Sequence, residues 1–252
     1  MNELAKLGDF SLDFMPEEEQ RAPILRFKMG EYVCPPLHDD RNLVNGLLAV
    51  NLGSLRDTLT AWQDGTPHPV EEHEAYVLYG ETLPTDGQLT SYPPRENGSS
   101  ALVEGKKIDA MLFVEGSDWQ PVTLVAGTAT AMIQMKTALK RCKGLARSYS
   151  PADWSPVWQM RGGNFYEHPK AGKVKIPLFE VVGMVKADGT TKALEQGFDM
   201  TPCETLGDRV PRPSGRKAGS AQPMIATGVV VPDKSASSAA TMPRDVDDDI
   251  PF

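Results

Sequence analysis

This chain of 252 residues has few of the features that mark secreted or membrane proteins. Cysteine is scarce: Cys34, Cys142 and Cys203 are odd in number and far apart, so we expect reduced thiols rather than a disulfide framework. No apolar run approaches about eighteen residues, the length that crosses a membrane. The opening MNELAKLGDF lacks the basic region and apolar core of a secretory signal. The sequence therefore predicts a cytoplasmic protein with no membrane partner.

Common signatures of enzyme sites are missing as well. The chain has no phosphate-binding glycine loop ending in Gly-Lys-Ser/Thr and no Gly-x-Ser-x-Gly nucleophile motif. Metal donors occur within residues 34–40 and 68–74, but neither stretch has the ligand set of a closed zinc site. The carboxylates and lysines that a nuclease could use are Asp109, Glu115, Lys106 and Lys107, at a generic spacing. We expect no enzyme activity, no metal and no cofactor.

Turn-forming residues dominate what is present. The chain has 21 prolines, 22 glycines and 40% hydrophobic residues, which favours a core built from short elements. Residues 42–62 and 128–149 have apolar residues at helical spacing, and Thr128 or Thr130 could cap the second helix. The segments that read as strands are 24–29, 32–34, 74–81, 107–116, 120–127 and 173–185, the last with Pro177 as an edge or bulge signal. These patterns predict a mainly β (β-rich α+β) fold: an OB-like barrel (oligonucleotide/oligosaccharide-binding) with an extra helix and loops.

Composition also divides the chain into four parts. Residues 1–22 are polar and proline-flanked, and we expect a flexible arm. Residues 23–202 would form the folded body. Residues 203–244 have no aromatic residue and many Ser, Ala, Gly and Pro, which predicts a disordered linker. Residues 245–252, DVDDDIPF, form an acidic tip with an apolar end.

The net charge of −8 hides an uneven distribution. Residues 1–127 hold 9 Lys/Arg and 21 Asp/Glu, whereas residues 128–192 hold 11 Lys/Arg and 4 Asp/Glu. A basic block inside an acidic protein can attract nucleic acid locally. The alternative is a solvated helix face whose last cations suit the helix dipole.

The basic block also contains aromatic residues, the second requirement of a surface that binds single-stranded DNA (ssDNA) without sequence preference. The segment 160–173, MRGGNFYEHPKAGK, reads as a glycine-hinged loop or hairpin that presents Phe165 and Tyr166 to bases. Trp154 and Trp158 stand four residues apart, and a core position for at least one of them is the alternative. The candidate ssDNA-binding residues are Lys136, Lys140, Arg141, Lys143, Arg147, Tyr149, Trp158, Arg161, Phe165, Tyr166, Lys170, Lys173 and Lys175.

The terminal sequence DDDIPF has a distinct chemistry. Ile250 and Phe252 can enter apolar pockets on a partner, Pro251 limits the freedom lost on docking, and the acidic run favours a basic rim. An ordinary acidic tail would explain the aspartates but not the Ile-Pro-Phe end. The candidate partner-binding residues are Asp247, Asp248, Asp249, Ile250, Pro251 and Phe252.

This tip resembles the C-terminal tip of bacterial single-stranded-DNA-binding proteins (SSBs), and the order of body, linker and tip is similar. The body does not align with the bacterial SSB domain, so no DNA-contact position is carried over from it. The pattern is more similar to a phage or mobile-element version with a diverged body, which would work in the cytoplasm of a bacterial host.

The resemblance implies a protein that coats ssDNA in DNA replication, recombination and repair and recruits partner proteins through its tip. A recombination factor or DNA-processing enzyme that carries an SSB-like tip is the alternative, and an adaptor without DNA affinity is a third. The sequence leaves open whether the protein forms a homo-oligomer.

Overall fold

Strands make up most of the regular structure in the computed structural model, which describes residues 22–39, 41–63, 69–85, 89, 92–94, 100–150, 153–168 and 172–211. The elements, with 3-10 helices written η, are β1 (Ile24–Lys28), β2 (Glu31–Val33), α1 (Pro35–His38), β3 (Leu47–Val50), η3 (Leu52–Ser54), β4 (Arg56–Ala61), β5 (Glu71–Tyr76), η4 (Val77–Tyr79), β6 (Leu102–Phe113), β7 (Gln120–Ala126), α2 (Ala129–Leu145), β8 (Trp154–Arg161), β9 (Phe165–His168), β10 (Gly172–Lys175), β11 (Leu178–Lys186), β12 (Thr191–Ala193), α3 (Thr201–Glu204) and η6 (Gly207–Arg209).

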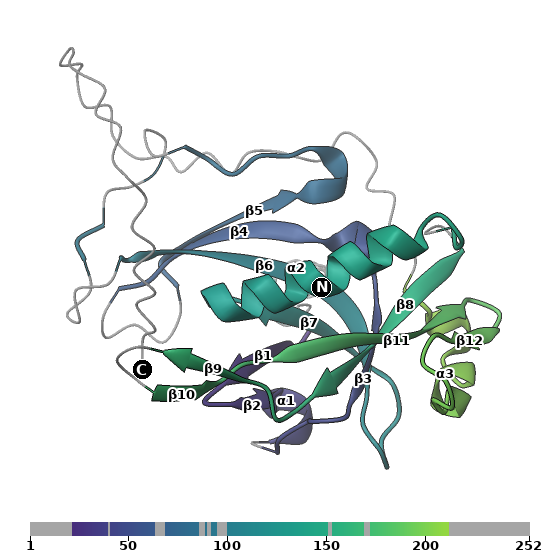
Figure 1. The fold of residues 1–252 in the computed structure, drawn as a ribbon. Coiled ribbons are helices and arrows are strands. Elements are labelled where there is room, and N and C mark those ends of the chain that lie inside the picture. Colours follow the sequence, from purple (N-terminus) through teal and green to yellow (C-terminus); the bar gives the residue numbers. More distant parts are fainter. Residues whose placement is uncertain are drawn as a thin grey trace, which may run out of the picture.

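The main sheet is strongly curled and resembles half of a barrel (Figure 1). Its strand order is β12-β11-β8-β3-β6-β7-β1-β2, and β4 and β5 join beside β6. The long strand β6 pairs with β3 near one end and with β4 near the other. Strands β3 and β4 are therefore two halves of one bent strand, interrupted by η3, where the Asn51 side chain accepts a hydrogen bond from Gly53 N. The mainly β fold predicted from the sequence is confirmed.

The predicted helix over 42–62 is wrong, because this segment forms β3, η3 and β4. Strand β3 is buried on both faces of the sheet, so it lacks the alternation of apolar and polar residues by which a half-exposed strand is recognised. Leu48 and Val50 face the core beneath α2, while Leu47 and Ala49 pack on the opposite face. A continuous apolar run of this kind resembles a buried helix until its neighbours are known.

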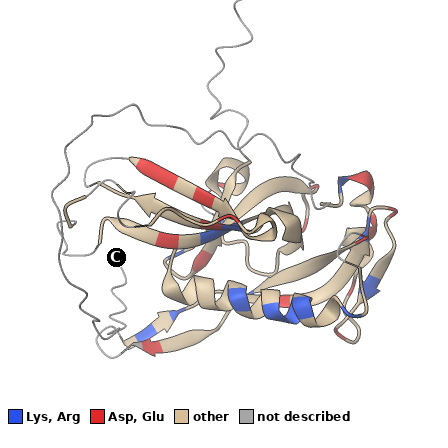
Figure 2. Ribbon diagram, turned by 90° about the horizontal axis from the view of Figure 1, so that it is seen from above, with Lys and Arg blue, Asp and Glu red and all other residues tan. Residues whose placement is uncertain are grey.

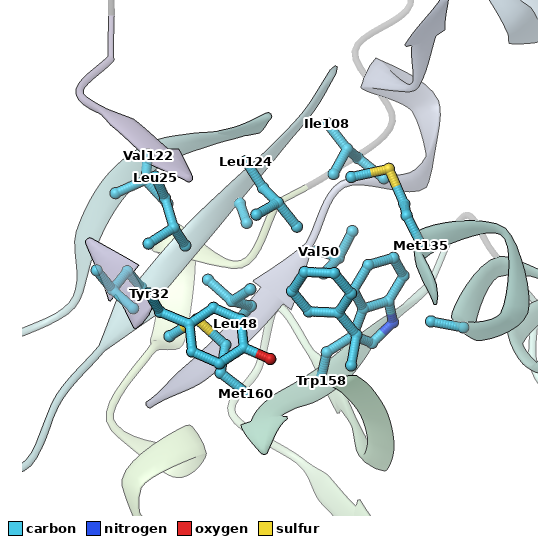
Figure 3. Packing of buried hydrophobic residues seen from close by; sticks show 14 of the residues in the cluster. Leu25, Tyr32, Leu48, Val50, Ile108, Val122, Leu124, Met135, Trp158 and Met160 are labelled. Atoms are coloured by element: carbon cyan, nitrogen blue, oxygen red, sulfur yellow. The ribbon is translucent and has the colours of Figure 1, made fainter. Parts of the chain in front are cut away.

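The helix α2 covers the concave face of the sheet and confirms the prediction for residues 128–149. The Thr128 hydroxyl accepts a hydrogen bond from Ala131 N, as an N-cap does. The inward side of α2 buries Ala131, Met135, Ala138 and Cys142. These side chains pack against residues of the sheet, among them the fully buried Trp158 (Figure 3).

The predicted reduced thiols are confirmed, since all three cysteines are buried and free of disulfides. Burial raises the pKa of Cys142 to about 11 and that of Cys203 to about 12. Both thiols are therefore protonated at neutral pH and poor nucleophiles. Within the described residues, no helix has the length and apolar character needed to cross a membrane.

The boundary predicted at residue 203 is wrong, because the folded body continues to at least Pro211. Cys203, Leu206 and Val210 are buried in a second cluster on the face of the sheet opposite α2. The indole nitrogen of Trp119 donates a hydrogen bond to the Pro202 carbonyl at 2.9 Å. Residues 203–211 resemble a linker in composition because they include few apolar residues, yet Cys203, Leu206 and Val210 are all buried. Residues 1–21 of the predicted arm and 212–252 lie outside the described residues.

The other strand predictions, apart from that for residues 173–185, hold with shifted ends. The β1–β2 hairpin and β7 lie where the sequence predicts them, and β6 begins five residues earlier than expected. The strand expected at 74–81 ends at Tyr76, where the chain enters η4.

Candidate nucleic-acid interface

The segment 160–173, predicted to be a loop or hairpin, forms a hairpin. Strands β9 and β10 lie between β8 and β11 in the chain and pair antiparallel as a separate two-stranded sheet (Figure 1). Gly163 has φ of +81°, a conformation that side chains rarely adopt, so glycine is needed where the chain leaves β8. Phe165 is 46% exposed and Tyr166 is 37% exposed. The hairpin thus carries two large aromatic rings at the surface of the molecule.

Alternation along the strands places the two rings on different faces of the hairpin. Phe165 stands opposite Lys175 in the register, and Tyr166 stands opposite Val174. The Lys173 ammonium lies 5.5 Å from the centroid of the Phe165 ring, so Phe165, Lys173 and Lys175 share one face. A ring flanked by two exposed lysines is the combination that stacks a base while pairing with its phosphates.

Pro177 separates the hairpin from the main sheet. The sequence predicts one strand over 173–185, but the structure divides this stretch between β10 and β11. Proline has no N–H to donate to a ladder, which explains an interruption at this point. The β-bulge lies further on, between Val181 and Gly183.

Tyr32 on β2 anchors both ends of the hairpin segment. Its hydroxyl accepts a hydrogen bond from Leu178 N at 2.6 Å and lies 2.9 Å from the carbonyl oxygens of Arg161 and Leu178. The ring is buried against Phe27 and Phe179. The last residue of β8 and the first of β11 are therefore joined through a single side chain.

We predict that Tyr32→Phe lowers the free energy of unfolding by about 1–3 kcal/mol, because the partly buried Leu178 N–H loses its acceptor while the ring packing is kept. Chemical denaturation of both proteins measures the loss. Amide hydrogen exchange at Leu178 should accelerate in the variant. Equal unfolding free energies would show that the hydroxyl does not hold the hairpin.

The same hydroxyl predicts a pH dependence. Burial raises the pKa of Tyr32 from the ordinary value of 10.0 to about 12, although the hydrogen bond from Leu178 lowers it in part. The folded protein therefore holds this proton more tightly than the unfolded chain does, so the stabilisation is complete below pH 10 and is lost as the pH rises toward 12. The native protein should lose on the order of 2–3 kcal/mol more than Tyr32→Phe over that interval.

The β1–β2 turn adds cations beside the hairpin. A Cβ atom at Gly30 would lie 2.4 Å from Lys175 Cδ, so the stem of Lys175 crosses the turn. Arg26 and Lys28 are exposed on β1, whereas Leu25 is buried and Phe27 is half-buried. The sequence reasoning missed these two cations, although their alternation with inward Leu25 and Phe27 was a usable signal. We call Arg26, Lys28, Phe165, Tyr166, Lys173 and Lys175 the hairpin surface.

A second basic surface lies along α2. Lys136, Lys140, Arg141, Lys143 and Arg147 are all exposed on or just after this helix, and Figure 2 shows the row of Lys and Arg that they form. Tyr149 follows them and is half-buried against Trp154. The structure thus divides the predicted ssDNA-binding residues into two groups, one on the hairpin and one along α2.

Two predicted contact residues have other roles. Trp158 is fully buried and donates its indole N–H to the Cys142 sulfur at 3.4 Å, so it is a core residue and cannot stack on a base. Arg161 pairs with Glu180 at 2.8 Å and Glu195 at 3.0 Å. With two carboxylates around it, Arg161 is a poor phosphate ligand. Lys170 and the tip residues 247–252 lie outside the described residues.

The acidic part of the body is organised into ion pairs on β4, β5 and β6. Arg56 lies 2.5 Å from Asp109 and 3.5 Å from Glu74, and Lys107 lies 2.5 Å from Glu72. Lys106 pairs with Asp57, and the His73 ring lies within hydrogen-bond distance of the Glu71 carboxylate. The residues considered for a nuclease are thus tied to partners, except Glu115, which is exposed after β6. Among the described residues, no three His, Cys, Asp or Glu side chains form a group that could hold a metal.

Comparisons with protein-family models, curated proteins and solved structures find no match to this chain.

Proposed function

We propose that this protein binds single-stranded DNA through the hairpin surface. The observation that carries the proposal is the exposed Phe165 ring with Lys173 and Lys175 on the same face of a projecting hairpin. Stacking on such a ring tolerates any base, and the lysines neutralise phosphates. Exposed Arg26 and Lys28 extend the positive charge next to it.

The order of elements supports an OB-like body. The bent strand β3–β4, β6 and β7 are antiparallel neighbours, with β5 added along the other edge of β4, and α2 leads to the paired strands β8 and β11. Strand β8 pairs back onto β3. In OB folds the loop between the fourth and fifth strands contributes to oligonucleotide binding, and the β9–β10 hairpin connects β8 and β11, the two strands that would correspond to that pair in an OB-like body.

We further propose that the protein acts in DNA replication, recombination or repair and recruits partner proteins through residues 247–252. This part rests on the similarity of DDDIPF to the tip of bacterial SSBs and on the chemistry of an apolar end behind three aspartates. A phage or mobile-element protein in a bacterial cytoplasm fits the diverged body.

Titration of a labelled oligo-dT with the protein separates the functional classes. We expect binding that weakens with salt and leaves the strand intact, because phosphate contacts release counterions. Cleavage or annealing of strands would replace the proposal with the DNA-processing alternative. Absence of binding at low salt would favour an adaptor that works through its tip alone.

A further inference from the structure

A group of aromatic rings and cations, separate from the hairpin surface, lies just beyond the end of α2. The rings of Tyr149 and Trp154 meet edge to face, with centroids 5.3 Å apart. The Lys186 ammonium lies 4.8 Å from the Trp154 ring centroid, and the Lys192 ammonium lies 5.6 Å from that of Tyr149. We call these four residues the α2-end platform.

Strand register puts the platform on the same side of the sheet as α2. Trp154 stands opposite Lys186 in the β8–β11 pairing, and Lys192 stands opposite Met184 in the β11–β12 pairing. Trp158, four residues after Trp154 on β8, points into the core beneath α2, and side chains an even number of positions apart share a face. The platform therefore lies on the α2 side of the sheet, directly after the end of the helix that carries the row of cations.

The charge of this face is not compensated within the described part of the chain. None of the five cations Lys136, Lys140, Arg141, Lys143 and Arg147 makes an ion pair with a described carboxylate, whereas Arg56, Lys106, Lys107 and Arg161 all do. Lys192 is also exposed. Asp153 and Asp188 line a pocket of about 350 Å³ together with Lys186, so we do not assign Lys186 to a phosphate.

We propose that the α2-end platform and the α2 cations form a second contact segment for single-stranded DNA, an inference that rests on the proposed function. Bases would stack on Tyr149 and Trp154, and phosphates would pair with Lys143, Arg147 and Lys192. Trp154 and Arg161 are the two ends of β8, about 23 Å apart at the rise of a strand, and the hairpin begins just after Arg161. A short strand would bind at the hairpin surface alone, and a longer strand would continue from it along the α2 side to the second segment.

Oligonucleotide length provides the test. We would measure the affinity of oligo-dT of about 6 and about 20 nucleotides, with one protein per strand. The first length lies within the range of about 4–16 nucleotides that one OB fold covers, and the second exceeds it. The variants are Arg147→Glu/Lys192→Glu, Lys173→Glu/Lys175→Glu and the control Arg209→Glu. Arg209 is exposed on η6, on the opposite side of the sheet, and pairs only with exposed Asp118 among the described residues. Thermal unfolding of each variant checks that the fold is intact.

The proposal predicts that Arg147→Glu/Lys192→Glu weakens the longer strand at least about tenfold and leaves the shorter one within about twofold, because only the longer strand reaches the second segment. Lys173→Glu/Lys175→Glu should weaken both lengths, and Arg209→Glu neither. If Arg147→Glu/Lys192→Glu changes neither length while the hairpin variant weakens both, the second segment is refuted and the proposed function stands. If the native protein binds neither length, the proposed function itself fails. Tighter binding by Arg147→Glu/Lys192→Glu would also overturn the inference and identify this face as a site for acidic protein segments.

Discussion

Replacing Phe165 with alanine is expected to weaken ssDNA binding by between about fivefold and about 150-fold, since one stacked base contributes roughly 1–3 kcal/mol. Phe165 has the strongest geometric case because it shares a hairpin face with Lys173 and Lys175. Tyr166 lies on the other face, so Tyr166→Ala should have a smaller effect. The double variant should lose more affinity than either single one. Fluorescence anisotropy of a labelled oligo-dT measures all three.

The matched control is Tyr79→Ala. Tyr79 is 39% exposed, close to the 37% of Tyr166, but lies on η4, directly after the acidic strand β5. It should leave the affinity unchanged. Equal losses from Tyr79→Ala and Phe165→Ala would mean that the assay reports a general effect of removing surface rings. Unchanged affinity in the Phe165/Tyr166 double variant would remove the hairpin from the proposal.

A chain ending at Pro202 is expected not to fold stably. This truncation removes Cys203, Leu206 and Val210, which are buried against Trp119 and the outer face of the sheet. Burying three such side chains stabilises a protein by about 4–8 kcal/mol, which is comparable with the total stability of many domains, roughly 5–15 kcal/mol. Circular dichroism during heating measures the loss of the cooperative transition.

The control for this truncation is a chain ending at Pro211. It keeps the second core cluster and the hydrogen bond from the Ser155 hydroxyl to the Pro211 carbonyl. We expect it to unfold at the temperature of the full chain. Identical unfolding of the chains ending at Pro202 and Pro211 would contradict the placement of residues 203–211 in the folded body.

The sequence predicted the fold best where local chemistry decides it. The cap at Thr128 and the amphipathic spacing of α2 identify that helix, and the strand patterns at 24–29 and 32–34 identify the two strands of the β1–β2 hairpin. Residues 47–61 were mistaken for a helix because β3 is covered on both faces, a property that depends on α2 and α3, far along the chain. The end of the body was missed for a similar reason. Leu206 and Val210 are core residues because they share a buried cluster with Trp119. No local sequence pattern connects them to that residue.

The residue types of the candidate site could be predicted from the sequence, but their arrangement in space could not. The glycines and aromatic residues of 160–173 indicated a hairpin with exposed rings, and the exposure of Phe165 and Tyr166 agrees with that. Only the sheet register shows that Trp158 faces inward, that Arg161 meets Glu180 and Glu195, and that Lys186 and Lys192 come beside Trp154 and Tyr149. These contacts join residues that are distant in the chain, and spacing alone does not determine them.

The central claim is that the body holds unpaired nucleotides through the exposed rings and cations of the hairpin surface. The most direct test is the salt dependence of the affinity for an oligo-dT of about 6 nucleotides, long enough to cover one OB-sized site. If Arg26, Lys28, Lys173 and Lys175 each neutralise a phosphate, a plot of log affinity against log salt concentration should fall with a slope of about −3. The slope should become shallower by about half in Lys173→Glu/Lys175→Glu. Absence of binding at low salt, or a slope that this substitution does not change, would contradict the claim.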